Sequence, residues 1–305
     1  ADRKGERVEL TADGSRLLVR TSDRRIIVHD AEIPQPAEGP AVTAGDRGHS
    51  DQTLQFQGLG DLPGGKFRSH AMGMSSDGRF VVGHSQTAHG YDLFRWSESD
   101  GIQRVGPPRP KVANTEAGSV SDDGKVICGI GAMAGHKDYS ALLWPTADSV
   151  VRIAPRRSAA QDISADGTIV VGRQRIDEIW TAFRWTADGI QQLPPAPGHR
   201  HTEAGAVTRD GALVLGTMFN HPDTPSFQYA DFRRWQSAQP VIWEGEETRP
   251  LPGFEPGFNW NATDLSDDGK IVTGVRWPHG EHRNGIGSQA FLWHAGQVTL
   301  LEPLS

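Results

Sequence analysis

Residues 160–172 read AQDISADGTIVVG, and this stretch sets the interpretation of the whole chain. An Asp-Gly pair supports the positive φ that a tight hairpin between two twisted strands requires. The same pattern recurs around six Asp residues, namely Asp13, Asp77, Asp123, Asp166, Asp210 and Asp268. The sequence therefore predicts a tandem array of β-hairpins with one Asp-Gly turn in each repeat.

The positions that flank each Asp-Gly pair recur as well. Ser or Thr stands two residues before the Asp, and an aliphatic residue or Met stands three before it. Ala stands six before it in five copies, with Arg7 as the exception, and keeps side chains small where the repeats converge. An apolar run such as residues 169–172 (IVVG) follows the turn and is predicted to be the second strand of the hairpin.

Two more strands complete each repeat. A third strand ends in a Trp that we expect to fill the gap between neighbouring repeats, and a fourth strand follows a short turn, as in residues 189–193. The Trp residues are Trp96, Trp144, Trp185, Trp243 and Trp293. Four short antiparallel strands in about 45 residues are typical of a propeller blade.

We therefore predict an all-β fold in which residues 1–305 form one β-propeller, with six four-stranded blades. A seventh blade would have to lie in the first insertion, at residues 31–50. The predicted repeat units are residues 6–65, 66–110, 111–155, 156–198, 199–255 and 256–305. We name the strands of a blade A to D from the inside outward.

Three features of the units follow from their spacing. Residues 240–243 are the third strand of the fifth unit, so residues 217–239 are predicted to be a long B–C loop. The first unit has its third strand at residues 25–30, without the Trp. The C-terminal run at residues 298–301 is predicted to be strand D of the last blade.

The repeat resembles the HAF repeat of probable extracellular bacterial proteins. The residues that carry the resemblance are the segment 59–65 (LGDLPGG), the turn 75–78 (SSDG) and the third strand 94–96 (FRW). The His of the family's His-Ala-Phe triplet is absent, since residues 181–183 read TAF. The resemblance covers residues 57–305 and implies a propeller-like fold and an extracellular or periplasmic location, but no activity.

Composition excludes several classes of function. The formal net charge of −7 and the scattered Lys and Arg residues argue against nucleic acid as a partner. No window approaches the roughly 18 apolar residues of a membrane helix, so we expect no membrane insertion. The single cysteine, Cys128, is expected to be a buried core residue. We expect the protein to be a monomer. The chain begins without Met, which fits either a removed signal peptide or a trimmed chain.

The B–C and D–A connections lie at one end of a propeller and are rich in His and Tyr. Nine of the twelve His residues and all three Tyr residues fall there. Loops on a rigid scaffold are where ligands usually bind, so this end is the predicted functional face, here called the loop face.

Two patterns on the loop face suggest polar binding sites. The position seven residues before each turn Asp is predicted to form a collar at the channel mouth, and it holds Glu6, His70, Glu116, Ala159, Glu203 and Asn261. The alternative to a binding site at this collar is a hydrated channel entrance.

The second pattern is a pair of short His motifs, which with His221 suggest a divalent metal site for Zn or Ca. The candidate ligands are His199, His201, His221, His279 and His282; the alternative is solvated loop histidines.

Two functions of different classes remain open. The first is a secreted or cell-surface module that binds a polysaccharide or another extracellular ligand. The second is a polysaccharide lyase that acts by β-elimination and needs a base, an acid and a cation beside the uronate carboxylate. A structural spacer is a third alternative, and the excess of His residues on the loop face argues against it.

The candidate catalytic residues are His70, His201, Tyr91 and Arg157, and the candidate ligand-binding residues are Arg68, Glu116, Arg200, Glu203, Tyr229, Trp260, Asn261 and Trp277. Trp260 and Trp277 are candidates for exposed-loop residues that stack on sugar rings, and the alternative is that either one covers the core.

Overall fold

The computed structural model describes the repeats almost completely. The described residues are 7–10, 16–20, 26–30, 58–107, 112–133, 138–220, 235–280 and 287–301. Every regular element among them is a β-strand, so the predicted all-β class is confirmed. No helix in this part of the chain is long and apolar enough to cross a membrane.

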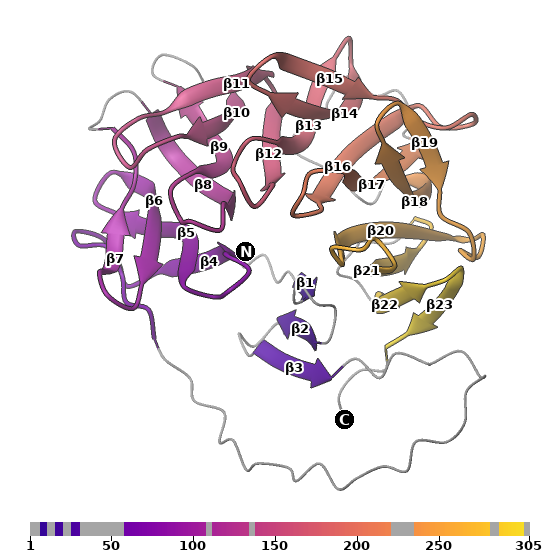
Figure 1. Ribbon diagram of the computed structural model, residues 1–305, viewed down its shortest axis with the longest axis horizontal. Coiled ribbons are helices and arrows are strands. Elements are labelled where there is room, and N and C mark those ends of the chain that lie inside the picture. Colours follow the sequence, from indigo (N-terminus) through magenta and orange to yellow (C-terminus); the bar gives the residue numbers. More distant parts are fainter. Residues whose placement is uncertain are drawn as a thin grey trace, which may run out of the picture.

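Five four-stranded antiparallel sheets are arranged around a common centre, with the first strand of each sheet innermost (Figure 1). This is the predicted β-propeller. The first blade holds β4 (Ser69–Met74), β5 (Phe80–Thr87), β6 (Gly90–Ser97) and β7 (Gly101–Arg104). The second holds β8 (Val112–Val120), β9 (Ile127–Met133), β10 (Tyr139–Trp144) and β11 (Val151–Arg156), and the third holds β12 (Ser158–Ile163), β13 (Val170–Ile176), β14 (Ile179–Thr186) and β15 (Gly189–Leu193). The fourth holds β16 (His201–Val207), β17 (Leu213–Asn220), β18 (Gln236–Glu244) and β19 (Glu247–Pro250), and the fifth holds β20 (Phe258–Leu265), β21 (Ile271–Pro278), β22 (Gln289–His294) and β23 (Gln297–Leu300).

A three-stranded sheet formed by the start of the chain lies between the first and last of these blades (Figure 1). It consists of β1 (Arg7–Leu10), β2 (Arg16–Arg20) and β3 (Ile26–Asp30), and β1 contacts β20 and β21. It corresponds to the first predicted unit. The total number of blades stays a prediction, because this sheet has three strands among the described residues. The predicted 31–50 insertion lies outside them.

The Asp-Gly turns explain why Ser or Thr recurs two residues before each Asp. In the third blade the Ser164 hydroxyl donates to Asp166 and accepts the backbone N–H of Ile169. The Asp166 carboxylate in turn accepts the N–H of Thr168, and Gly167 has φ of 76°. The other four complete blades repeat this network at Ser75, Ser121, Thr208 and Ser266. Each turn thus satisfies its own polar groups within six residues.

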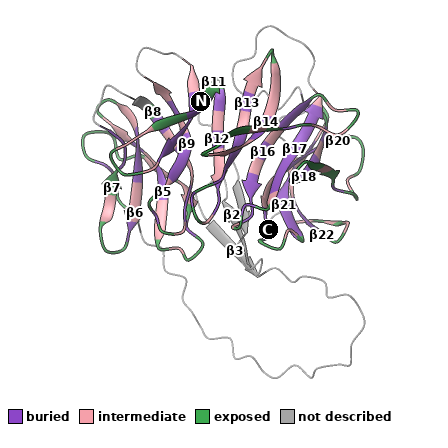
Figure 2. Ribbon diagram, turned by 45° about the horizontal axis from the view of Figure 1, so that its top comes forward, coloured by how far each residue is buried: buried purple, intermediate pink, exposed green. Residues whose placement is uncertain are grey.

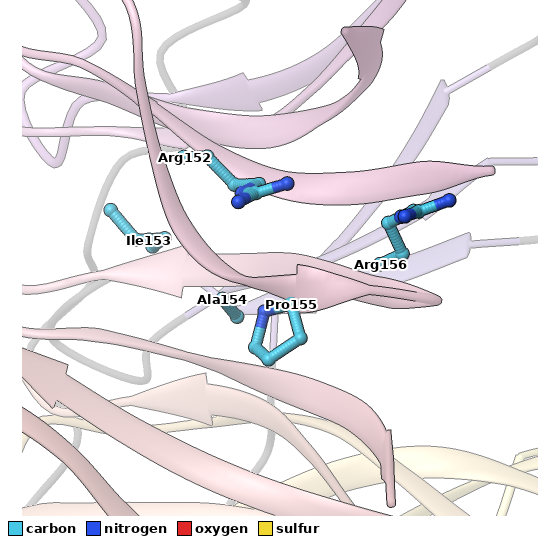
Figure 3. A pocket seen from close by; sticks show the side chains of 5 residues that line it. All are labelled: Arg152, Ile153, Ala154, Pro155 and Arg156. Carbon is cyan, nitrogen blue, oxygen red and sulfur yellow. The ribbon is translucent and has the colours of Figure 1, made fainter. Parts of the chain in front are cut away.

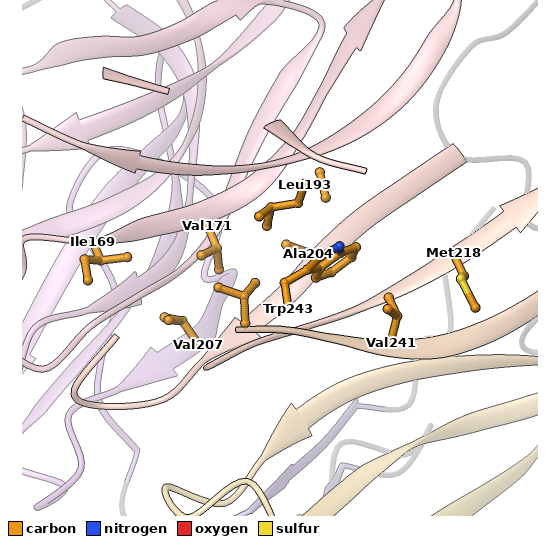
Figure 4. Packing of buried hydrophobic residues seen from close by; sticks show 10 residues of the cluster. Ile169, Val171, Leu193, Ala204, Val207, Met218, Val241 and Trp243 are labelled. Atoms are coloured by element: carbon orange, nitrogen blue, oxygen red, sulfur yellow. The ribbon is translucent and has the colours of Figure 1, made fainter. Parts of the chain in front are cut away.

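The core lies between blades and not within them. One cluster joins Val171 and Leu193 of the third blade to Val214, Val241 and Trp243 of the fourth (Figure 4). Trp243 is buried, and its indole N–H donates to the carbonyl of Pro194 in the preceding blade. The predicted role of the strand-C Trp as an interblade filler is therefore confirmed for Trp243. Buried residues follow the inner strands, whereas exposed residues lie in the connections and on outermost strands such as β11 (Figure 2).

The structure confirms some local predictions and corrects others. β23 pairs with β22, so the C-terminal run does form strand D of the last blade, and Cys128 is buried. The loop predicted over residues 217–239 is shorter, because β17 continues to Asn220 and β18 begins at Gln236. Extension of these two strands is favoured by their mutual pairing beyond Met218.

Candidate functional site

The loop face is built from the starts of the A and C strands and the ends of the B and D strands. The connection between β11 and β12 is a single residue, Arg157, whose φ of 62° is unusual for a residue with a side chain. The backbone N–H of Arg157 donates to Tyr139, and that of Arg175 donates to the Arg157 carbonyl. This places Arg157 on the rim of the face, where its side chain is half exposed.

Three blades contribute to one polar network at the channel mouth. Arg173 of the third blade pairs with Glu203 of the fourth, and both side chains are at least 85% buried. Asn261 of the fifth blade donates to Glu203 over 3.2 Å and to the Thr217 hydroxyl over 3.1 Å. Two of the predicted collar positions, Glu203 and Asn261, thus meet directly. The partly buried setting makes this ion pair less screened by salt than a surface pair.

A tryptophan and a second carboxylate extend the network outward. The guanidinium groups of Arg173 and Arg175 lie 5.2 and 5.7 Å from the ring centroid of Trp180, within cation–π range. Arg175 and Arg157 both pair with Glu178, the latter over 3.5 Å. Trp180 is half-buried and packs against the cluster that contains Phe219 and Trp235.

A second cluster on the loop face belongs to the first blade alone. His70 on β4 and His84 on β5 are register partners whose rings stack with centroids 5.0 Å apart. Tyr91 on β6 meets His84 edge-on at 5.2 Å. The structure therefore brings the predicted residues His70 and Tyr91 into one cluster, with His84 between them.

Tyr139 on β10 experiences the charge of Glu116 on β8, also on this face. The pKa of Tyr139 is raised first by burial and then by the negative charge of Glu116. A raised phenol pKa keeps Tyr139 protonated at neutral pH, as a hydrogen-bond donor.

The three predicted metal ligands within the described residues, His199, His201 and His279, each contact protein groups. The Nε2 atom of His199 lies 2.9 Å from the Ser237 carbonyl, and that of His279 lies 3.0 Å from the Phe258 carbonyl. His201 accepts the backbone N–H of Trp180 at Nδ1. Across the described ranges, no three His, Cys, Asp or Glu side chains are placed to hold a metal ion. His221 and His282 lie outside those ranges, so the full five-His site stays untested.

Burial corrects four candidate residues, and the first is Asn261, which is only 3% exposed and has its amide engaged by Glu203 and Thr217. His201 is only 3% exposed and stacks on Phe219, so it cannot meet a polysaccharide as a base. Trp260 and Trp277 are 2% and 0% exposed, so they are not exposed stacking residues and the alternative that they cover the core holds. Trp277 lies beside Trp235, which itself stacks on Phe219 with centroids 4.0 Å apart. The aromatic residues of the fourth and fifth blades therefore cover the core.

The remaining candidates stay on the surface or outside the described residues. Arg68 and Arg200 are exposed on the loop face. Tyr229 lies outside the described residues. Four residues of the polar network were not predicted from the sequence, namely Arg173, Arg175, Glu178 and Thr217. The repeat itself contained a signal for Arg173. It stands seven residues after the turn Asp, which is the position that His84 occupies in the first blade.

The fold defines the chain as a β-propeller module. No family model matches the chain, and no curated protein matches it. The resemblance to the HAF repeat therefore stays a prediction from the repeat motif.

Solved structures give the same fold at low sequence identity. A putative TolB from Agrobacterium tumefaciens matches with a TM-score of 0.53 and 14% identity, over 77% of this chain and 80% of that one. TolB from Acinetobacter baumannii matches with a TM-score of 0.53 and 11% identity, over 98% of this chain and 64% of that one. The β-propeller domain of the trilobed protease from Pyrococcus furiosus, which has an open velcro topology, matches with a TM-score of 0.53 and 10% identity, over 100% of this chain and 85% of that one. Since all three identities are low, these similarities establish the fold and nothing further.

Proposed function

We propose that this propeller is a secreted or cell-surface binding module that holds a glycan on its loop face, over the channel mouth. The observation that carries the proposal is the network in which Arg173, Glu203 and Asn261 come from three different blades and meet at one place. Arg173 and Glu203 supply the charged hydrogen bonds with which proteins hold sugar hydroxyl and carboxylate groups, and the buried Asn261 orients Glu203. The half-buried Trp180 adds an aromatic side chain for stacking on a sugar ring.

The network tells against a merely hydrated entrance, because each of its three side chains is oriented by a partner in a neighbouring blade. A rigid and pre-oriented set of polar groups lowers the ordering cost of binding a ligand. An extracellular or periplasmic location is part of the proposal, since it is where the HAF resemblance would place the chain.

Binding is tested by calorimetric titration with a panel of neutral and acidic polysaccharides, using the protein and its Glu203→Gln variant. We expect the variant to bind at least about tenfold more weakly, because one lost charge-assisted hydrogen bond is worth roughly 1.5–3 kcal/mol. The matched control is Glu244→Gln, at the exposed end of β18 on the opposite face. Equal affinity of the protein and the Glu203→Gln variant for every bound glycan would disprove the mouth site.

A lyase is the second candidate, and the cluster of His70, His84 and Tyr91 favours it over a lyase centred on His201. An imidazole and a phenol in contact are the groups that a base and an acid need. Acidic polysaccharide incubated with the protein would then gain ultraviolet absorbance from unsaturated chain ends. The Tyr91→Phe variant would lose this gain but keep its glycan affinity, and a flat trace with the parent protein would rule out the lyase.

A further inference from the structure

The outermost strand of the second blade has an irregular register beside the loop face. Arg152 of β11 pairs with Leu142 of β10, and Arg156 pairs with Ser140. Arg152 and Arg156 are thus four residues apart on β11, whereas their partners Leu142 and Ser140 are only two residues apart on β10. Two steps of an antiparallel strand span roughly 7 Å, so the bulge brings the two arginines much closer along the sheet than a regular strand would.

The bulge forms an open pocket of about 400 Å³, lined by five consecutive residues from Arg152 to Arg156 (Figure 3). Ile153 and Ala154 are buried and line the pocket between the two exposed arginines. Within the described part of the chain, neither arginine side chain has an ion pair or a hydrogen bond. Two unpaired guanidinium groups beside one hollow are a ready site for an anion, because each offers several N–H donors in a fixed plane.

The positive charge continues from this pocket to the channel mouth. Arg157 follows Arg156 directly, and Arg157 and Arg175 share the single carboxylate of Glu178. Arg173, next along this path, forms an ion pair with Glu203. Five arginines along this path thus face three carboxylates, those of Glu178, Glu203 and Glu116, on a chain whose net charge is −7. The excess is local, and it attracts an anion to this sector of the rim rather than to the protein as a whole.

We infer that Arg152 and Arg156 form an anion subsite that takes a carboxylate of an acidic polysaccharide, whose chain continues past Arg157 to the channel mouth. The inference rests on the proposed glycan binding and names the class of glycan. Arginine forms paired N–H···O bonds with a carboxylate, which fixes the orientation of the group as well as its charge. The exposed ring of Pro155 suits the C–H face of a sugar ring, whereas Ile153 and Ala154 belong to the core.

The first test measures the affinity for oligogalacturonate and, as the neutral probe, for a maltooligosaccharide of equal length. We expect the double variant Arg152→Gln/Arg156→Gln to bind oligogalacturonate at least about tenfold more weakly, and the affinity of the parent protein to fall with added salt. The matched control is Arg249→Gln, an exposed arginine on β19, the outermost strand of another blade. Equal weakening by both variants would overturn the subsite, and so would tighter binding of a single-stranded oligonucleotide than of oligogalacturonate.

The second test uses the parent protein and does not depend on any variant. Phenylglyoxal modifies accessible arginines, and mass spectrometry of the peptides reports each one. We expect oligogalacturonate to protect Arg152 and Arg156 but not Arg249, whereas the maltooligosaccharide protects none of them. Protection combined with an unaltered affinity of the Glu203→Gln variant would sustain the subsite and overturn the mouth site. Loss of affinity in Glu203→Gln without protection would overturn the subsite alone.

Discussion

The guanidinium group of Arg209 pairs with the carboxylate of Asp122, which lies 87 residues earlier in the chain and two blades away. Arg209 also lies 3.6 Å from Asp267 of the next blade. The backbone N–H of Asp122 donates to Ala165, and that of Ala165 donates to Arg209. Ser76 donates to Asp122 through both its N–H and its hydroxyl. These residues stand immediately before the turn Asp in five blades, and they tie the Asp-Gly turns together at the end opposite the loop face.

Removal of the Arg209–Asp122 pair is expected to lower the free energy of unfolding slightly. A double-mutant cycle with Arg209→Ala and Asp122→Ala should give a coupling free energy of about 0.5–1 kcal/mol, because both side chains are partly exposed. The coupling should shrink in about 1 M salt, where the Debye length is about 3 Å. Chemical denaturation of the four proteins measures it. Strictly additive effects at low salt would show that the pair does not stabilise the ring.

The Ser164→Ala variant is expected to lower the free energy of unfolding by about 1–3 kcal/mol. Its fully buried hydroxyl both donates to Asp166 and accepts from Ile169, so its removal leaves the buried N–H of Ile169 without this partner. Ser99→Ala, on an exposed turn of the first blade, is the control and should change stability by less than about 0.5 kcal/mol. Similar losses in the two variants would refute a special role for the turn network.

The Asp-Gly turns also predict how stability depends on pH. The pKa values of Asp77 and Asp123 are lowered to about 2, chiefly by the backbone N–H groups of Arg79 and Lys125. The pKa of Asp268 is lowered to about 2 as well, chiefly by the hydroxyl of Ser266. Because the folded state lowers these pKa values, the turns stabilise the protein fully above the ordinary carboxyl range, and this contribution is lost as the pH falls toward about 2.

The melting temperature should therefore decline between about pH 5 and pH 2. In Asp123→Asn, position 123 keeps an oxygen acceptor but no longer titrates, so the decline should be shallower than in the parent protein. Differential scanning calorimetry over this range gives both curves. Parallel curves would mean that Asp123 has the same pKa in the folded and unfolded states.

Gly172→Ala is expected to cost about 3 kcal/mol or more. A Cβ atom at this position would lie 2.0 Å from the carbonyl oxygen of Ala159 on the neighbouring strand, which cannot move without breaking the sheet. The glycines at the same place in the other complete blades, Gly83, Gly129, Gly216 and Gly274, would each meet a carbonyl oxygen at 2.0–2.2 Å. Gly58→Ala, where nothing lies within 4 Å, is the control for thermal unfolding. A Gly172→Ala protein as stable as Gly58→Ala would mean that the strands separate readily.

The hairpins were predictable because their causes are local. The turn at Asp166 is fixed by Ser164, Asp166 and Gly167, which are within four residues of one another, and by the apolar run that follows. Repetition of the same short pattern then indicated the blades, and with them the loop face. The position of Trp243 between two blades followed from the same argument.

Burial on the loop face was not predictable, because it depends on residues far away in the chain. Trp277 is covered in part by Trp235, which precedes it by 42 residues, and His201 is covered by Phe219. Nothing near either residue in the sequence distinguishes a covered aromatic side chain from an exposed one. The same holds for the pairing of Arg173 with Glu203, which joins two blades.

The sequence alone determined the all-β class, the hairpin repeat and the end of the propeller where chemistry could gather, since backbone preferences and hydrogen bonds within six residues are sufficient for these. Only the tertiary structure decided which loop-face side chains are accessible and which meet. Those outcomes arise from packing between blades, where residues 30 to 90 positions apart come into contact through the curvature of the ring. The bulge that brings Arg152 and Arg156 together is likewise a result of how β11 pairs with β10.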